Sequence, residues 1–235
     1  MDPVRLQKYI SDSGLMSRRA SEEAILSGDI RVDGQIVSLG CKVDPDVNLI
    51  TYKGKVVLPR VESYTYVLIN KPRGIVTSAK DEKGRTCVTD LLPPEMGRLY
   101  PVGRLDMDSE GLLILTNDGA FTQRMTHPKH HVPKTYLVST KEELTEELIS
   151  SMNAPMKLDG YLLKPVEIRV TGPRKFEITL HEGRNRQIRR MCDQVGLRVA
   201  TLTRISFGPL KLGSLKPGYW RVLSPAEIKQ FKSEF

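Results

Sequence analysis

Apolar residues in the first part of the chain recur at the spacing of two short helices. Leu6 and Ile10 fall on one face of the first helix, and residues 18–27 repeat the helical spacing. Two short apolar runs follow, on either side of the dipeptide Asp-Gly at positions 33–34, which is the strongest short signal for a β-hairpin. The pattern predicts a small module of two helices and a hairpin within residues 1–60.

The remainder of the chain reads as strands and helices without the regular spacing of parallel βαβ units. A polar stretch at residues 53–63 predicts the boundary between two domains, residues 1–60 and 61–235. The apolar run at 112–115 predicts a buried strand, which the turn sequence Asn-Asp-Gly closes. Further strands are expected at 64–70, 136–138, 166–170 and 176–180, and helices at 142–152 and 186–195. We therefore predict an α+β fold with a mixed, largely antiparallel sheet and flanking helices.

Composition narrows the class of protein. The apolar fraction of 39% is that of a globular chain, and no apolar run approaches the roughly 18 residues of a spanning helix. The first residues lack the apolar stretch of a secretory signal, so we expect a soluble protein of the cytoplasm. The three cysteines are far apart and the four histidines form no helical pair. Neither a disulfide framework nor a metal site is expected.

The charge points to a polyanionic partner. The chain has a formal net charge of +8 and a pI near 9.4. Residues 1–60 have a net charge of +1, so most of the excess lies in the larger domain. A basic surface attracts nucleic acid by releasing counterions, whereas a membrane surface would require a basic amphipathic helix with bulky apolar anchors, which we do not find.

The densest group of carboxylates lies in the sequence GRLDMDSEG at residues 103–111. Asp106, Asp108 and Glu110 imitate part of a calcium loop, but position 12 of such a loop would be Asn117 rather than a bidentate glutamate. A phosphotransfer Asp-x-Asp is a second interpretation, although no good apolar strand precedes it. A loop that presents Asp106 beside Arg104 is a third, and a solvated acidic turn is the fourth.

A basic run, EGRNRQIRRM, occupies residues 182–191. On a helix Arg186, Arg189 and Arg190 share one face, and arginine is used almost without lysine, as suits phosphate and carboxylate recognition. The alternative is an ordinary solvated face. Tyr136, in the sequence HVPKTY, is expected at the start of a strand, either as core packing or as a platform for a flipped base.

Taken in order, these runs resemble the motifs of the RsuA/RluB/RluE/RluF family of ribosomal RNA pseudouridine synthases. The catalytic motifs are NKPRG at 70–74, GRLD at 103–106 with GLL at 111–113, TNDG at 116–119, KTY at 134–136 and EGRNRQIRRM at 182–191. Residues 1–60 resemble the S4 RNA-binding module through RLQKYI at 5–10, SRRA at 17–20 and VDG at 32–34. The resemblance covers nearly the whole chain.

The resemblance implies an S4-like module joined to a pseudouridine synthase domain, which isomerises a uridine in ribosomal RNA without a cofactor or metal. Asp106 is then the catalytic aspartate, Tyr136 packs on the target ring, and Arg189 pairs with the carboxylate of Asp106. Arg104 is expected to fill the gap that the uridine leaves in its stack. A carboxylate suits this chemistry as a nucleophile toward C1′ or C6, or as a base at C2′, provided that it stays ionised in a dry pocket. The sequence leaves these three routes open.

We expect basic side chains of both domains to bind the RNA. They are Lys71, Arg104, Arg184, Arg186 and Arg190 in the catalytic domain, and Arg5, Lys8, Arg18 and Arg19 in the S4-like module. The latter would contact phosphates, so that a stem-loop is recognised mainly by its shape. We expect a monomer.

The motifs disagree about the ribosomal subunit. The arginine-rich run resembles members that act on large-subunit RNA, whereas HVPKTY resembles members that act on the small subunit. We expect 23S rRNA as the substrate. The alternatives are the same chemistry on 16S rRNA, or a non-catalytic assembly factor that only binds rRNA and has no use for Asp106.

Overall fold

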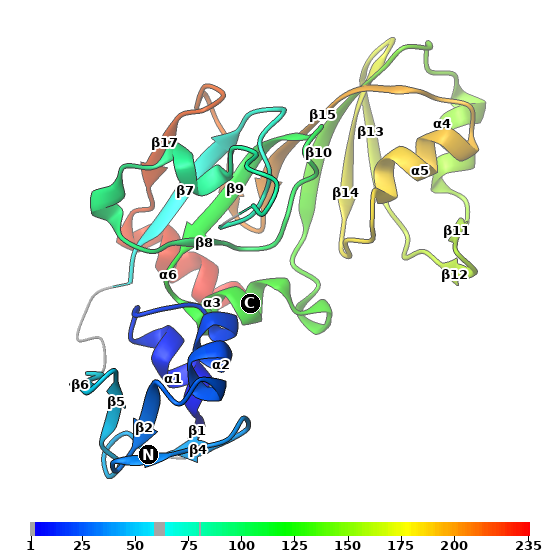
Figure 1. The fold of residues 1–235 in the computed structure, drawn as a ribbon. Helices are drawn as coiled ribbons and strands as arrows, with labels where there is room; N and C mark the ends of the chain where they lie inside the picture. The colour runs from blue at the N-terminus through cyan, green and yellow to red at the C-terminus, as the bar shows by residue number, and fades with distance from the viewer. Residues whose placement is uncertain (1–2, 59–63, 80) are drawn as a thin grey trace. The chain divides into compact units, whose positions relative to one another are not determined.

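The computed structural model describes residues 3–58, 64–79 and 81–235. The chain divides into two compact units, Met1–Tyr64 with Asn117–Gly119, and Thr65–Thr116 with Ala120–Phe235 (Figure 1). The domain boundary expected between residues 60 and 61 lies outside the described residues, so its position stays a prediction. No helix in the described part of the chain is long and apolar enough to cross a bilayer.

The first unit has the two helices and the hairpin that the apolar pattern predicts. Its helices are α1 (Leu6–Asp12) and α2 (Arg18–Leu26). Its strands are β1 (Val4–Arg5), β2 (Ile30–Val32), β3 (Gln35–Ile36), β4 (Lys42–Val43), β5 (Ile50–Tyr52) and β6 (Lys55–Val56). β1 pairs with β4, and the others form a sheet in the order β3-β2-β5-β6. Ser17 begins α2 by accepting a hydrogen bond from the Ala20 amide at 3.1 Å, as an N-cap serine does.

The second unit is built on a nine-stranded sheet. The strands are β7 (Tyr66–Lys71), β8 (Tyr100–Pro101), β9 (Glu110–Thr116), β10 (Lys134–Thr140), β13 (Glu167–Gly172), β14 (Lys175–Leu180), β15 (Val199–Phe207), β16 (Leu210–Lys211) and β17 (Trp220–Val222). Their order is β13-β14-β10-β15-β9-β7-β17, with β16 beside β15 and β8 beside β9. All pairs of these described strands are antiparallel except β9 with β15. The mixed, largely antiparallel sheet is thus confirmed.

The neighbouring strands β9 and β7 are buried on both faces. Leu68 and Leu112 belong to the cluster on one face, whereas Ile69 and Leu113 belong to the cluster on the other. Because side chains alternate along a strand, this double burial requires the unbroken apolar run that the sequence shows at 112–115. The two strands are therefore the rigid centre of the unit.

Helices cover both ends of the sheet (Figure 1). They are α3 (Gly119–Thr126), α4 (Glu146–Asn153), α5 (Gln187–Gln194) and α6 (Pro225–Glu234). The unit also has the 3-10 turns η1 (Val88–Leu91), η2 (Pro94–Met96) and η3 (Pro128–His130). A separate hairpin is formed by β11 (Lys157–Leu158) and β12 (Tyr161–Leu162). α4 and α5 agree with the expected helices, whereas α3 begins where only a turn was expected. Phe121 of α3 packs with Phe231 of α6 in the core, so tertiary contacts stabilise both helices.

Candidate active site

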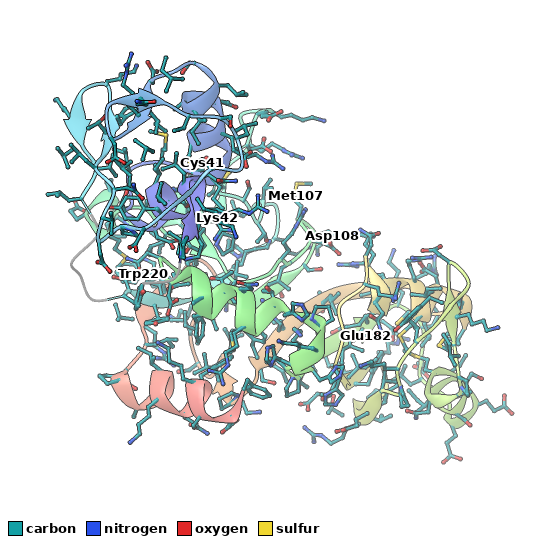
Figure 2. The ribbon with its side chains drawn as sticks, turned by 90° about the horizontal axis from the view of Figure 1, so that it is seen from below. Cys41, Lys42, Met107, Asp108, Glu182 and Trp220 are labelled. Atoms are coloured by element: carbon teal, nitrogen blue, oxygen red, sulfur yellow. The ribbon has the colours of Figure 1, made fainter. Side chains whose placement is uncertain are left out.

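The acidic loop, residues 103–109, connects β8 to β9 and carries Asp106. In Figure 2 it is marked by Met107 and Asp108, while Glu182 lies in the half of the unit that holds α5. The loop begins at Gly103, whose φ of 76° lies in the region that favours glycine. The amide of Ser109 donates to the carbonyl of Asp106 at 3.1 Å and closes a tight turn. Asp106 therefore stands at the start of a turn directly before a rigid strand.

The backbone on both sides of Asp106 is held by Thr77 and Gly74. The hydroxyl of Thr77 donates to the carbonyl of Leu105 at 2.6 Å and accepts from its amide at 3.2 Å. The amide of Gly74 donates to the carbonyl of Met107 at 2.8 Å. These bonds fix the main chain at the residues before and after Asp106, so the aspartate is preorganised. Nothing in the sequence singled out Thr77 for this role.

Gly111 fixes the start of β9 against β15. A Cβ at this position would lie 2.4 Å from the carbonyl oxygen of Arg204 and 2.5 Å from its amide nitrogen, and the φ of Gly111 is +109°. Arg204 is buried, and its Nε donates to the carbonyl of Leu112 at 2.7 Å. Only glycine allows this close parallel approach of the two strands.

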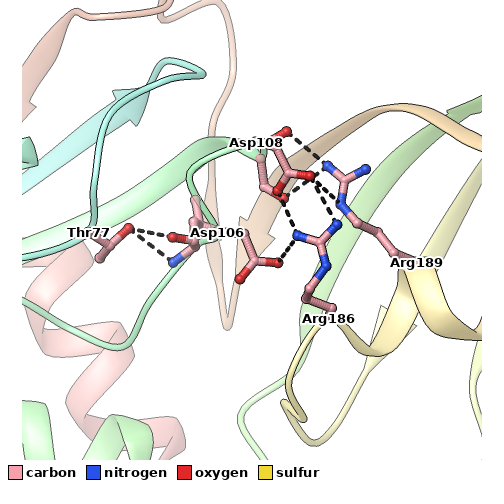
Figure 3. Close-up of polar contacts among 7 residues, drawn as sticks. Thr77, Asp106, Asp108, Arg186 and Arg189 are labelled. Carbon is pink, nitrogen blue, oxygen red and sulfur yellow. Dashed lines mark hydrogen bonds and ion pairs between the residues drawn. The ribbon is translucent and has the colours of Figure 1, made fainter. Parts of the chain in front are cut away.

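The basic segment, residues 182–190, approaches the acidic loop from the other half of the unit. Arg186 donates to both carboxylate oxygens of Asp108, at 3.0 and 3.1 Å, and its Nη1 lies 3.6 Å from Oδ2 of Asp106 (Figure 3). The φ of Arg186 is +49°, which is rare for a residue other than glycine. This costly conformation begins α5 and accompanies a guanidinium between two carboxylates.

Arg189 contacts Asp108 rather than Asp106. Its Nε lies 3.3 Å from Oδ2 of Asp108, and its Nη2 donates to the backbone carbonyl of Asp108 at 2.8 Å and weakly to the hydroxyl of Ser109 at 3.4 Å. The expected Arg189–Asp106 pair is therefore wrong for this structure. The i, i+3 spacing placed both arginines on one face correctly, but it could not show that a second aspartate would lie nearer to Arg189.

Charge pairing sets the state of Asp108. Hydrogen bonds from Arg186 are the main cause that lowers the pKa of Asp108, and the nearby charge of Arg189 acts in the same direction. Burial is the main reason why the pKa of Arg189 lies below its ordinary value, although that of an arginine stays high enough to keep the charge. The side chain of Asp106 is 38% exposed, so the dry pocket expected around it is not formed in this state.

Lys71 does not have the surface position expected of an RNA-binding residue. It is fully buried, and its ammonium donates to the carbonyls of Pro72 and Ile75 at 2.9 and 2.8 Å. Burial lowers its pKa to about 8, against the opposite effect of the neighbouring carboxylates, among which that of Asp106 is the strongest. Lys71 thus holds the loop whose Gly74 bonds to the acidic loop.

Tyr136 lies on β10, where its Cα partners are Ile178 on β14 and Arg204 on β15. Since Arg204 is also the partner of Gly111, one strand separates Tyr136 from the start of β9. Its partly buried ring packs against the apolar clusters of both halves of the unit. The tyrosine is therefore near the acidic loop by sheet register.

The outer arginines of the basic segment are held by the β11–β12 hairpin. The guanidinium carbon of Arg184 lies 3.1 Å from the ring centroid of Tyr161, and Arg190 forms two hydrogen bonds with Asp159, at 2.6 and 2.9 Å. Arg190 thus already has a carboxylate partner, so the expected contact with RNA would require an exchange. Arg104 is exposed, on the acidic loop itself.

The expected phosphate-binding residues of the first unit are at its surface. Arg5, Lys8, Arg18 and Arg19 are all exposed. Lys8 pairs with Asp12 at 2.6 Å within α1. Exposed pairs of this kind are weak, so they leave such a side chain available to a phosphate.

The two other carboxylates near Asp106 are engaged by neighbouring side chains. Glu110 accepts a hydrogen bond from the hydroxyl of Thr203 at 2.9 Å, and Asp108 is paired with two arginines. Across the described ranges, no three His, Cys, Asp or Glu side chains form a group that could hold a metal. Asp106 is thus a partly exposed carboxylate on a fixed backbone. Arg186 lies beside it, and Tyr136 lies near it by sheet register.

Comparison with known proteins agrees with the motifs. A family model described as RNA pseudouridylate synthase matches residues 65–194, and the S4 domain model matches residues 4–48. The chain is 38% identical to ribosomal large subunit pseudouridine synthase B of Bacillus subtilis, over 97% of this chain and 96% of the relative. It is 36% identical to the dual-specificity RNA pseudouridine synthase RluF of Escherichia coli, over 96% of this chain and 77% of the relative. A crystal structure of a pseudouridylate synthase has a TM-score of 0.71 and 31% identity, over 97% of this chain and 99% of that one.

Proposed function

Because the chain belongs to the RNA pseudouridine synthase family and carries an S4 domain, we propose that it converts a uridine of ribosomal RNA to pseudouridine with Asp106 as the catalytic residue. The observation that carries this proposal is the placement of Asp106. Its flanking backbone is fixed on both sides, by Thr77 and Gly74, while its carboxylate stays half exposed within reach of Arg186.

The reaction exchanges an N-glycosidic bond for a C-glycosidic bond at C5 of the same base. The base must be detached, rotated and reattached without leaving the site, so a carboxylate is needed at a fixed place beside the sugar. Asp106 acts as a nucleophile at C1′ or C6, or as the base that removes the C2′ proton. A fixed backbone serves all three routes, because misplacement of a reacting group by about 1 Å costs on the order of a hundredfold in rate.

The neighbouring residues take the roles that the motifs imply. Tyr136 stacks on the flipped uracil, and base stacking of this kind is worth about 1–3 kcal/mol. Arg186 and Arg189 lower the pKa of Asp108 and so keep its carboxylate ionised, and a bound RNA phosphate would compete with Asp108 for Arg186, since both offer two oxygens to a guanidinium. Arg104 is exposed on the acidic loop, where it would enter the RNA stack beside the flipped uridine.

For the substrate we propose 23S rRNA, which the similarity to the large-subunit enzyme of Bacillus subtilis favours. RluF of Escherichia coli is named for dual specificity, so similarity alone does not fix one target. We propose that the protein acts as a monomer, because one unit of one chain supplies all four site residues, Asp106, Tyr136, Arg186 and Arg189. We also propose that it acts in the cytoplasm, where the ribosomal RNA is. Pseudouridine mapping in both rRNAs of cells that lack the gene identifies the position.

The decisive experiment measures tritium release from C5-labelled uridine in rRNA by Asp106→Asn. The variant should bind rRNA as the parent does and release no tritium above background. Asp193→Asn, which removes an exposed carboxylate of α5, is the matched control and should retain parental turnover. Parental release by Asp106→Asn would contradict the catalytic assignment.

The same preparation tests the non-catalytic alternative. After incubation of the parent with rRNA, carbodiimide treatment should produce a new reverse-transcription stop at the modified position. Tight binding without a stop would instead support a protein that only assists ribosome assembly.

A further inference from the structure

The connection between β16 and β17 borders a surface hollow that has no part in the site described above. The hollow has a volume of about 450 Å³ and is lined by residues 211–216 together with Tyr219 and Arg221. It contains three basic side chains and no acidic one. A basic hollow on an RNA-modifying enzyme is a candidate for contact with the RNA backbone.

Two of the three basic side chains are available to a ligand. Lys211 and Lys216 are exposed, and neither forms an ion pair with any described residue. Arg221 differs, because it donates to both carboxylate oxygens of Glu227 at 2.6 and 2.9 Å. Phosphate binding by the two lysines would therefore break no existing pair.

Tyr219 combines an exposed ring with a fixed backbone. Its side chain is 64% exposed. Its amide donates to the carbonyl of Lys216 at 3.0 Å, and its carbonyl accepts from the amide of Asn70 at 3.0 Å. Asn70 further donates from its side chain to the carbonyl of Leu215 at 2.7 Å. The loop is thus tied to the end of β7, and the tyrosine ring is presented at low conformational cost.

The sheet register places this loop and the acidic loop at the same end of the neighbouring strands β17, β7 and β9. Asn70, which bonds to Tyr219, is the Cα partner of Leu112, and Lys71 is the partner of Gly111 at the start of β9. Two strand spacings, or about 10 Å, therefore separate the backbone of Tyr219 from that of β9. In Figure 1 the loop before β17 and the loop after β7 lie at the same end of the sheet. A few nucleotides of a single strand can span this distance.

We propose that Lys211, Lys216 and Tyr219, together the Tyr219 surface, bind an unpaired nucleotide of the RNA substrate next to the target uridine. The base stacks on Tyr219, and the two lysines contact its phosphates. An aromatic ring among lysines is the combination that single-stranded nucleic acid binds, and stacking tolerates any base. The inference rests on the proposed function for the identity of the RNA, but the binding itself needs no catalysis.

The test measures equilibrium binding of a fluorescent oligouridine of ten nucleotides, a readout that does not depend on turnover. Tyr219→Ala should weaken its binding by about tenfold, the loss expected of one base stack. Tyr219→Phe should bind as the parent does, because the ring is kept. A plot of log affinity against log salt concentration has a negative slope. In the double variant Lys211→Ala with Lys216→Ala this slope should become less steep by about 1.4, since each phosphate contact to a single strand contributes about 0.7.

Lys175→Ala is the matched control, because Lys175 is exposed on β14, which is separated from β17 by four strands of the sheet. An oligouridine that contains 4-thiouridine should cross-link to the peptide that carries Tyr219. Parental binding by Tyr219→Ala, with cross-links only elsewhere, would overturn the proposal.

Turnover on rRNA separates this inference from the proposed function. If the parent is active, Tyr219→Ala should raise KM and leave kcat unchanged, because the surface lies away from the reacting atoms. If the parent releases no tritium yet the oligouridine binds at Tyr219, the proposed function fails and the Tyr219 surface stands. An active parent with an unchanged KM in Tyr219→Ala refutes the surface alone.

Discussion

The acidic loop and the basic segment meet in the candidate site but are held in different ways. The acidic loop is fixed through its backbone, by the hydroxyl of Thr77, the amide of Gly74 and the close strand approach at Gly111. Arg186 of the basic segment reaches this loop instead through side-chain charge, in a pair with Asp108 in which both partners are partly exposed.

The two kinds of support differ in how far they let the residues move. Backbone hydrogen bonds and steric limits hold one geometry, whereas exposed ion pairs are weak and exchange partners at little cost. The carboxylate that we propose reacts with the substrate, Asp106, is on the fixed side. Arg186, which we propose donates to an RNA phosphate, is on the side that can rearrange.

The largest effect should come from Gly111→Ala. The new methyl group would lie within 2.5 Å of the backbone of Arg204, which cannot move without separating β9 from β15. We expect a loss of more than about 3 kcal/mol in the free energy of unfolding, measured by urea denaturation. Gly160→Ala is the control, since Gly160, in the two-residue turn between β11 and β12, also has a positive φ but no described atom lies within 4 Å of the place a Cβ would take, and it should lose only about 1 kcal/mol. Equal losses in the two variants would show that the strand approach is unimportant.

Thr77→Val tests the fixed side within the site itself. The variant keeps the shape of the buried side chain but leaves the amide and carbonyl of Leu105 without their partner, which should cost about 1–3 kcal/mol. Because Asp106 follows Leu105, kcat should fall by about tenfold to a hundredfold with little change in KM. Thr77→Ser keeps the hydroxyl and should restore kcat. An unchanged kcat in Thr77→Val would mean that the backbone clamp does not position the aspartate.

Asp108→Asn tests the adaptable side and should have the smallest effect. The stability loss at neutral pH should be about 1 kcal/mol, because the pair with Arg186 is partly exposed and the buried Arg189 keeps its hydrogen bond to the backbone carbonyl of residue 108. The pKa of Asp108 is depressed in the folded state, so its contribution is present above the unfolded value near 4 and is lost as the pH falls through the folded value. As the pH falls below about 4, the free energy of unfolding of the variant should therefore decrease less than that of the parent.

Turnover completes this test. Without Asp108, Arg186 is released, and kcat/KM should change by less than tenfold. Glu142→Gln, which breaks the exposed pair of Glu142 with Arg198, is the control and should leave turnover unchanged. A hundredfold loss of kcat/KM in Asp108→Asn would contradict this expectation and show that Asp108 must be held as closely in place as Asp106.

Local signals predicted the elements whose cause is local. The Asp-Gly hairpin and the apolar run of β9 each follow from a few adjacent residues. β15, β17 and α6 were not predicted, because their stability comes from partners far along the chain. β17 lies on the edge beside β7, and Phe231 of α6 is buried among aromatic and aliphatic side chains from distant parts of the unit.

The candidate site was predicted by its motifs but not by its contacts. Position in the motif was enough to bring Asp106, Arg186 and Arg189 together. It could not distinguish Asp106 from Asp108 as the partner of Arg189, because two carboxylates two residues apart in one loop compete for the same guanidinium. It also could not show that Lys71, in a motif rich in basic residues, would be fully buried.

The parallel pair of β9 with β15 joins segments that are synthesised far apart in time. The hydrogen bond between Glu110 and Thr203 spans 93 positions of the chain. While the chain emerges from the ribosome, residues up to Thr116 are exposed long before β15 exists to support the start of β9. Pairing of such distant segments is slow and comes late in folding. The start of β9, which follows the acidic loop directly, therefore lacks this support until β15 has been translated.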